Sequence, residues 1–325
     1  MSESDVKEGK SNINLIEECD NFPYCQRDLD TYMQYVSTYY HFRVPSCPRT
    51  LGYVLPSVAE VFRNLPDWEV DDFSTPRTLT LIFGDDAVFR SAAVARTVQA
   101  MRETGHFQVL EGWRDELYPV YDSDGSILFS LERSASPLFG IITYGVHMTA
   151  FTKSNSSYGL KIWVPRRAKN KQTYPGMLDN SVAGGIASGE NIFESLVREC
   201  AEEASLPESV VRESARPGGT VTYFYLRDAR AGGETGLMQP ECQYVYDLEL
   251  PEDVTPKPGD EEVQEFYLWT VEEVQEALRK GEFKPNCALV ILDFFVRHGI
   301  ITSANEKHYI QLVSRLHRHL EFPTP

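Results

Sequence analysis

The chain has 325 residues, more than one hydrophobic core usually organises, so its length favours two domains. Hydrophobic residues make up 42% and charged residues 24% of it, which is typical of a globular protein and argues against extended disorder, collagen-like repeats and a coiled coil. Lysine and arginine number 31 against 48 acidic residues, a formal charge of −17 that repels polyphosphate backbones. We therefore expect no nucleic acid among its partners.

Membrane insertion and secretion are not expected either. The longest apolar run, around residues 289–296, contains Asp293 and is too short to cross a bilayer, and the first ten residues have no hydrophobic signal core. The six cysteines never form a C-x-x-C pair, so neither a zinc ribbon nor a dithiol redox motif is indicated. These features predict a cytoplasmic protein with reduced thiols.

The first part of the chain predicts a mixture of helices and strands after a polar leader at residues 1–14. The expected elements are, in order, a tyrosine-rich helix over 24–40, a strand at 52–55, a helix around 92–101, a strand-rich run over 107–120 and a strand at 127–131. The run Ser134-Ala135-Ser136-Pro137 is typical of a seam between domains. We therefore assign residues 15–136 to an N-terminal accessory domain.

Residues 137–325 predict a second domain of mixed type. The expected elements are strands at 141–151 and 160–164, a helix from 191 to 206, strands at 221–226, 244–248 and 266–269, and helices towards the end. The whole chain is thus predicted to be α+β.

The helix after Asn191 carries the sharpest pattern. The segment that contains it reads GGIASGENIFESLVRECAEEASL from Gly184, and its apolar residues recur every three or four positions. At about 100° per residue, Glu199, Glu202 and Glu203 fall on the face opposite the apolar stripe. Clustered carboxylates repel one another unless a cation lies among them, and their oxygens suit Mg²⁺ or Mn²⁺. A solvated acidic face is the alternative.

The spacing of six residues favours a functional site. They are Gly184, Glu190, Arg198, Glu199, Glu202 and Glu203. Their order matches the Nudix box, G-x5-E-x7-R-E-U-x-E-E-x-G-U, in which U is a bulky apolar residue. The match departs where Ser205 replaces the last glycine, a change that concerns the end of the helix and not the carboxylates.

The resemblance extends beyond the box. Segments similar to the thiamine-pyrophosphokinase-related Nudix hydrolases of fungi and plants lie at 163–167, 173–179 and 182–185. Segments that resemble the extra domain before Nudix in that family lie at 22–24, 112–114 and 138–140. The resemblance implies an α/β/α Nudix sandwich around a mixed sheet, preceded by a smaller α+β domain.

The resemblance also implies a function. The protein would be a metal-dependent diphosphate hydrolase that converts oxidised, damaged thiamine diphosphates, such as oxothiamine or oxythiamine diphosphate, to monophosphates. Glu199, Glu202 and Glu203 would bind Mg²⁺ or Mn²⁺ with the carbonyl group of Gly184, while Glu190 would support the helix. Arg198 cannot deprotonate, so we expect it to orient these carboxylates.

Other candidates follow from residue type and position. Glu261 and Glu262, in a loop before a strand, could supply the catalytic base, although an exposed acidic turn is equally consistent with the pattern. A local cationic patch for the phosphates could come from Arg166, Arg167 and Lys171, or these could be solvated charges.

Trp113 and Arg114 offer a flat ring and a fixed cation near the seam between the domains, where small-molecule sites are common. The accessory domain is thus expected to help hold the organic end of the substrate.

Two alternatives remain from the sequence. One is a hydrolase of ADP-ribose, a dinucleotide or another nucleoside diphosphate derivative. The other is a non-catalytic Nudix module that binds a ligand similar to thiamine diphosphate. The sequence does not fix the oligomeric state.

Overall fold

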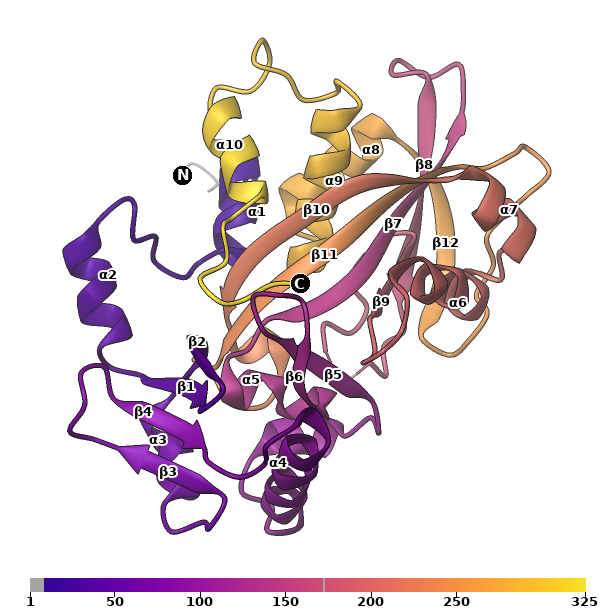
Figure 1. The fold of residues 1–325 in the computed structure, drawn as a ribbon. Coiled ribbons are helices and arrows are strands. Elements are labelled where there is room, and N and C mark those ends of the chain that lie inside the picture. Colours follow the sequence, from indigo (N-terminus) through magenta and orange to yellow (C-terminus); the bar gives the residue numbers. More distant parts are fainter. Residues whose placement is uncertain (1–8, 172) are drawn as a thin grey trace, which may run out of the picture.

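The computed structural model describes residues 9–171 and 173–325. A six-stranded mixed sheet forms the centre of the C-terminal half (Figure 1). Its strands are β7 (Thr143–Lys153), β8 (Leu160–Arg167), β9 (Val182–Gly185), β10 (Ala215–Leu226), β11 (Met238–Glu249) and β12 (Val263–Thr270). They run in the order β10-β11-β7-β8-β12, and β9 pairs with the first half of β7. Only the β7–β11 pair is parallel among these pairings.

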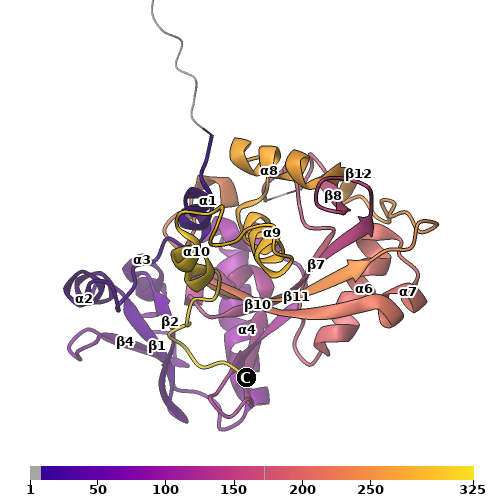
Figure 2. The same ribbon diagram turned by 90° about the horizontal axis from the view of Figure 1, so that it is seen from above.

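Helices cover both faces of this sheet, as Figure 2 shows. On one side lie α6 (Ile192–Ala204) and α7 (Glu208–Ser214), and on the other α1 (Asn12–Cys19), α8 (Val271–Lys280), α9 (Pro285–Arg297) and α10 (Tyr309–Leu316). Successive side chains of β7 point to opposite faces of the sheet, so both faces need a cover. Val146 and Met148 face α6, while Gly145 and His147 face the opposite way. The predicted α/β/α sandwich is confirmed.

The N-terminal half has its own mixed architecture and core. A sheet in the order β2-β1-β4-β3 packs beside the hairpin β5–β6 and the long helix α4. The elements are α2 (Leu29–Val36), β1 (Tyr40–Val44), β2 (Cys47–Val54), α3 (Pro56–Ala59), β3 (Trp68–Asp71), β4 (Thr78–Leu81), α4 (Ala87–Glu103), β5 (Leu117–Tyr121), β6 (Ile127–Glu132) and α5 (Ser136–Phe139). This is the smaller α+β unit expected ahead of Nudix.

The start of the described chain packs against the C-terminal half. Helix α1 spans the predicted boundary at residue 14 between the polar leader and the accessory domain, and it packs on α9 in the core of the C-terminal half. Asp20, just after α1, is fully buried and accepts hydrogen bonds from Arg315 and Arg318. The start of the described chain is therefore built into the C-terminal half.

Two expectations for the N-terminal half need correction. Within the predicted tyrosine-rich helix over 24–40, only Leu29–Val36 is helical. The run over 107–120 is a strand only from Leu117, because its beginning forms a 3₁₀ turn at Gln108–Gly112. There the carboxylate of Glu234 accepts the backbone N–H group of Val109, which therefore needs no strand partner.

No helix in the described ranges is both long and apolar enough to cross a membrane.

Candidate active site

Helix α6 begins and ends close to where the sequence predicts. The side chain of Asn191 caps its first turn by accepting the N–H groups of Phe193 and Glu194. Ser205 follows its last turn with a φ of 51°, a left-handed conformation that glycine adopts without strain. The departure from the Nudix box at this position therefore concerns the helix end, as expected.

The guanidinium group of Arg198 connects three carboxylates. Its Nε and Nη2 atoms donate to the two oxygens of Glu190 at 2.9 and 3.1 Å. Its Nη1 atom donates to Glu199 Oε1 at 2.9 Å and to Glu202 Oε2 at 3.1 Å. Burial opposes ionisation of Glu190, but the hydrogen bonds from Arg198 outweigh it and lower its pKa. Arg198 thus contacts all three carboxylates, and its orienting role stays a prediction.

Glu199 and Glu203 lie in less solvated positions than Glu202. Burial raises the pKa of Glu199, although the positive charges of Arg198 and Arg133 oppose this effect. Burial also raises the pKa of Glu203 well above its ordinary value, and the charges of Asp179 and Glu199 add to the effect. A nearby cation would relieve this destabilisation.

Strand β9 lies directly against these two side chains. The N–H group of Ala183 donates to Glu203 Oε2 at 2.9 Å. A β-carbon placed on Gly184 would lie 2.0 Å from Glu199 Oε1, so only glycine fits beside this carboxylate. The Gly184 backbone and the carboxylates of α6 are therefore immediate neighbours.

The oxygen donors fit the chemistry of a hard divalent cation, but the three carboxylates do not converge on one point as the sequence suggested. In the described part of the chain, no three His, Cys, Asp or Glu side chains form a metal-binding group. At α6 the guanidinium of Arg198 draws Glu199 and Glu202 towards itself, while Glu203 turns to Ala183. The donors that would hold Mg²⁺ or Mn²⁺ are nonetheless carboxylate and carbonyl oxygens, which such ions prefer.

The acidic loop predicted to contribute a base is fastened to the end of α6. The N–H groups of Lys257 and Gly259 donate to the carbonyl oxygens of Ala204 and Glu203. Further along the loop, Glu262 forms an ion pair with Lys171 and lies 3.9 Å from Arg114. Burial raises the pKa of Glu262, but Lys171 outweighs it and the pKa is lowered.

Glu261 is exposed and remains consistent with the solvated alternative.

The predicted cationic patch divides into separate roles. Lys171 pairs with Glu262, as described above. Arg166 donates to the carbonyl oxygen of Gly176 and to the hydroxyl of Tyr267.

Arg167 is buried, and its guanidinium donates to Asp179 Oδ2 at 2.6 Å and to two backbone carbonyl oxygens. Because its donors are engaged inside the protein, the structure corrects its assignment as a substrate-binding residue.

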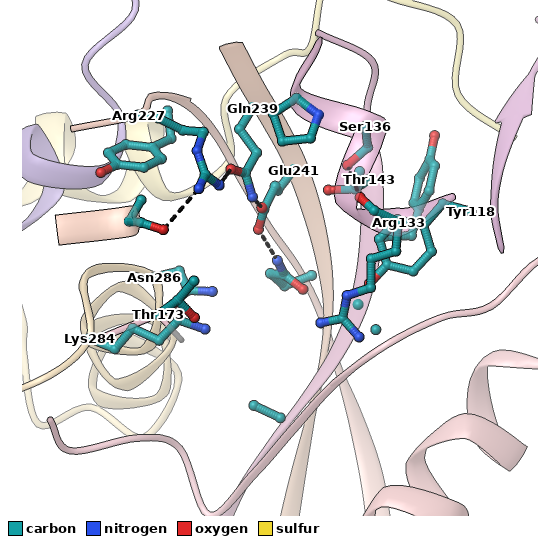
Figure 3. A pocket seen from close by; sticks show the side chains of 18 of the residues that line it. Tyr118, Arg133, Ser136, Thr143, Thr173, Arg227, Gln239, Glu241, Lys284 and Asn286 are labelled. Carbon is teal, nitrogen blue, oxygen red and sulfur yellow. Dashed lines mark hydrogen bonds between the residues drawn. The ribbon is translucent and has the colours of Figure 1, made fainter. Parts of the chain in front are cut away.

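A cavity of about 240 Å³ opens where the two halves of the chain meet. One wall is the face of the sheet that carries alternate residues of β7, β10 and β11, and it includes Gly184 and Gly185 of β9. The beginning of α9 and the segment at Thr173 and Tyr174 cover part of it. Figure 3 shows Lys284 and Asn286 on that side, opposite Tyr118 and Arg133.

The N-terminal half supplies a wall of this cavity, but not through the pair of residues expected. Arg114 lines it. The indole N–H of Trp113 donates to Asp115, and its ring lies 4.4 Å from the guanidinium of Arg102. Trp113 does not line the cavity as far as the described residues show, which corrects its assignment to the substrate wall.

The sequence analysis missed Arg133, which follows β6. Its guanidinium points into the cavity in Figure 3, lies over the ring of Tyr118 and pairs with Glu116 at 2.8 Å. It also missed a polar group on the sheet wall: Tyr223, Arg227, Gln239, Glu241 and Gln243. The alternation of Gln239, Glu241 and Gln243 in the first half of β11 was the available signal, since polar residues spaced by two share one face.

Comparisons with known proteins agree with this architecture. A model of the NUDIX domain matches residues 144–287, and a model of a domain of unknown function, DUF4743, matches residues 25–143. The Saccharomyces cerevisiae protein YJR142W is 41% identical over 244 residues, which are 74% of this chain and 71% of that protein. Nudix hydrolase 24 of Arabidopsis thaliana, named as chloroplastic, is 34% identical over 269 residues, 82% of this chain and 70% of its own length.

The chain belongs to the Nudix hydrolases. It is therefore a pyrophosphohydrolase. This family acts on small-molecule diphosphates and generally uses a divalent metal ion. Among solved structures, that of DR0079 from Deinococcus radiodurans aligns with 55% of this chain and 99% of its own, with 23% identity and a TM-score of 0.41.

Proposed function

We propose that this Nudix hydrolase converts oxidised thiamine diphosphates, such as oxothiamine or oxythiamine diphosphate, to the monophosphate and inorganic phosphate. The observation that carries the proposal is the cavity beside Gly184, which adjoins the carboxylates of α6 and continues between the two halves of the chain. It combines cationic side chains near α6 with tyrosines and amides farther away. The resemblance to the thiamine-pyrophosphokinase-related family supports the same substrate.

The proposal assigns a role to each group of residues. Glu199, Glu202, Glu203 and the Gly184 carbonyl would hold Mg²⁺ or Mn²⁺, and a bound ion would offset the charge of the diphosphate oxygens. Arg198, with Glu190, keeps the helix carboxylates in place. Water attacks a phosphorus atom of the anhydride, and the bond to the bridging oxygen breaks. Attack at either phosphorus yields the monophosphate and phosphate.

Glu262 is the proposed residue of the later loop, as either the base or a further ligand. Its ion pairs with Lys171 and Arg114 lower its pKa, so it is ionised at neutral pH and able to accept a proton.

We also propose a cytoplasmic location, with residues 15–136 as the accessory domain and 137–325 as the Nudix domain, except that the start of the first range, at α1, packs on the Nudix half. Two contacts support an active role for the accessory domain. The carbonyl oxygen of Leu117 accepts the N–H group of Ser188, and the hydroxyls of Ser130 and Ser188 lie 2.7 Å apart. The hairpin β5–β6 therefore holds the loop that leads into α6.

A hydrolase of ADP-ribose, a dinucleotide or another nucleoside diphosphate derivative is the second candidate. The same cavity favours it, because tyrosines such as Tyr174 and Tyr225 can also stack on a purine ring.

Glu203→Gln is expected to lower kcat by at least about 10²-fold, because removing a charge from a metal-binding set weakens transition-state stabilisation. The measurement is steady-state phosphate release in Mg²⁺, with thermal unfolding as the test of folding. Glu213→Gln, an exposed change on α7, is the control. A folded Glu203→Gln protein with the turnover of the natural protein would disprove the ligand assignment.

Glu262→Gln is expected to lower kcat by about 10-fold or more with little change in KM, whereas Glu261→Gln is expected to change neither by more than about 2-fold. The two neighbours serve as a matched pair, since only Glu262 is ion-paired with Lys171. Equal, small effects on kcat would mean that the loop is merely solvated.

Arg133→Met is expected to raise KM for the diphosphate by about 10-fold or more, because a charge-assisted hydrogen bond to phosphate is lost. Arg96→Met is the control, because Arg96 is a cation of the same half that pairs with Asp67 and lies outside the cavity. An unchanged KM in a folded Arg133→Met protein would remove Arg133 from the proposed phosphate site.

The substrate proposal predicts the order of kcat/KM across a panel of diphosphates in Mg²⁺. Oxothiamine and oxythiamine diphosphates should exceed ADP-ribose and NADH by about 10-fold or more. The measurement is phosphate release for the thiamine compounds and chromatographic product analysis for all of them. A higher kcat/KM for ADP-ribose or NADH would establish the second candidate instead.

A further inference from the structure

The carboxylate of Glu241 lies on the sheet wall of the cavity and points into it (Figure 3). Three neutral donors hold it in place. Gln243 Nε2 donates to its Oε2 atom at 2.7 Å, the hydroxyl of Tyr223 donates to the same atom, and Gln239 Nε2 donates to Oε1. These neighbours orient the carboxylate without neutralising it.

No cationic side chain in the described ranges forms an ion pair with Glu241. Arg227 lines the same wall, but it makes its hydrogen bonds to other groups. Arg227 Nη1 donates to Gln239 Oε1 at 2.9 Å, and its Nη2 donates to the carbonyl oxygens of Ala231 and Gly232. Its donors thus serve the wall and the adjoining loop. An ionised carboxylate has about four acceptor positions. With three hydrogen bonds made, Oε1 of Glu241 keeps one position for a donor inside the cavity.

The opposite end of the cavity has the reverse character. Arg133 lies there with Tyr118, whose hydroxyl lies against Gly185, next to the glycine that touches Glu199. The cavity is therefore cationic where the diphosphate would lie, whereas the sheet wall carries one carboxylate, Glu241, and one cation, Arg227, whose hydrogen bonds go to other groups.

The sheet register gives the separation of these ends. Gly185 pairs with Gly145, which pairs with Gln243, and Glu241 lies two residues along the same strand. Strands about 4.8 Å apart and residues about 3.3 Å apart place Glu241 about 12 Å from Gly185. An inorganic diphosphate is too short to reach both ends, so an organic group must occupy the rest.

We propose that Glu241 selects diphosphates whose far end is a nitrogen heterocycle with an N–H donor, either an exocyclic amino group or the ring N–H of a lactam, by accepting a hydrogen bond from that donor. A ring that presents only carbonyl oxygens or C–H groups would leave this carboxylate without a donor or facing another acceptor. The inference rests on the proposed hydrolysis of a diphosphate at α6. It does not require that the heterocycle be the pyrimidine of thiamine.

The test compares ligands that differ only in this donor. Calorimetry with Mg²⁺ would give Kd for thiamine monophosphate and for its analogue with hydrogen in place of the pyrimidine amino group. The same comparison would be made for AMP and purine riboside monophosphate. These monophosphates contain no anhydride, so the result does not depend on turnover. The amino compound of at least one pair should bind at least about 10-fold more tightly, since a donor to a half-buried carboxylate is lost in the other.

Variants of the full chain test whether Glu241 causes the tighter binding of the amino compound. Glu241→Gln should reduce the ratio of the two Kd values to less than about 3-fold. Glu249→Gln, on the same strand and the same side but paired with Lys153 outside the cavity, should leave the ratio unchanged. Tyr223→Phe removes one supporting donor while it retains the charge of Glu241, and it should preserve most of the preference.

Each outcome either supports or overturns the role of Glu241. A preference in the adenine pair, with no binding of either thiamine compound, supports the role of Glu241 and rejects the proposed thiamine substrate. Equal affinities within both pairs, or no binding in either, overturn the role of Glu241. An unchanged ratio in folded Glu241→Gln does so as well. If Glu241→Gln does not fold, the comparison of the ligand pairs on the natural protein and on Tyr223→Phe still decides.

Discussion

Repulsion among carboxylates is the constraint on which the site depends. One helix of thirteen residues presents Glu199, Glu202 and Glu203, and the preceding loop adds Glu190. Like charges this close raise one another's pKa unless a positive charge is near. Arg198 meets that need at three of the four carboxylates, and its delocalised guanidinium cannot give up its proton. The remaining carboxylate, Glu203, accepts only a backbone N–H group. Burial raises its pKa well above its ordinary value, the charges of Asp179 and Glu199 add to this effect, and that hydrogen bond offsets only part of it.

The substrate cavity depends on the contact between the two halves of the chain. Gly185 accepts the close approach of Tyr118, because a β-carbon there would lie 1.9 Å from the tyrosine hydroxyl. Ser188 binds the hairpin β5–β6 through both its backbone and its hydroxyl. A shift of that hairpin would therefore move the loop before α6 as well. The N-terminal half thus contributes to the geometry of the carboxylates even though it supplies none of them.

The sequence predicts the helix and its polar face well because that information is local. The cap at Asn191, the apolar spacing of three and four, and the end at Ser205 all lie within one short segment, and the structure follows them closely. Arg167 illustrates what local pattern misses. It follows the strand predicted at 160–164, as a solvated or phosphate-binding cation would, but in the structure it ends β8 and its guanidinium donates to Asp179 inside the protein. Only the folded chain brings these two side chains together.

Arg133 and Glu241 were missed for a related reason. They lie more than a hundred residues apart, Arg133 in a turn just after β6 and Glu241 within β11, and the cavity gives them opposite roles. Trp113 was selected for its ring and its position near the seam, but its ring packs against Arg102 and the core of the N-terminal half. Residue type and proximity to a boundary predict that a wall exists. Which side chains form it depends on strand register and on the direction of each turn.

A protein with a formal charge of −17 must receive an anionic substrate through a local field of the opposite sign. Around the cavity, Arg114, Arg133 and Lys284 provide that field, and they come from three separate parts of the chain. Screening in salt reduces the repulsion from distant surface carboxylates over about 10 Å, whereas contacts inside the cavity are screened much less. The overall charge therefore discourages polyanions that approach from afar. The phosphates of a small ligand that enters the cavity meet mainly these cations, whereas its organic end meets the carboxylate of Glu241.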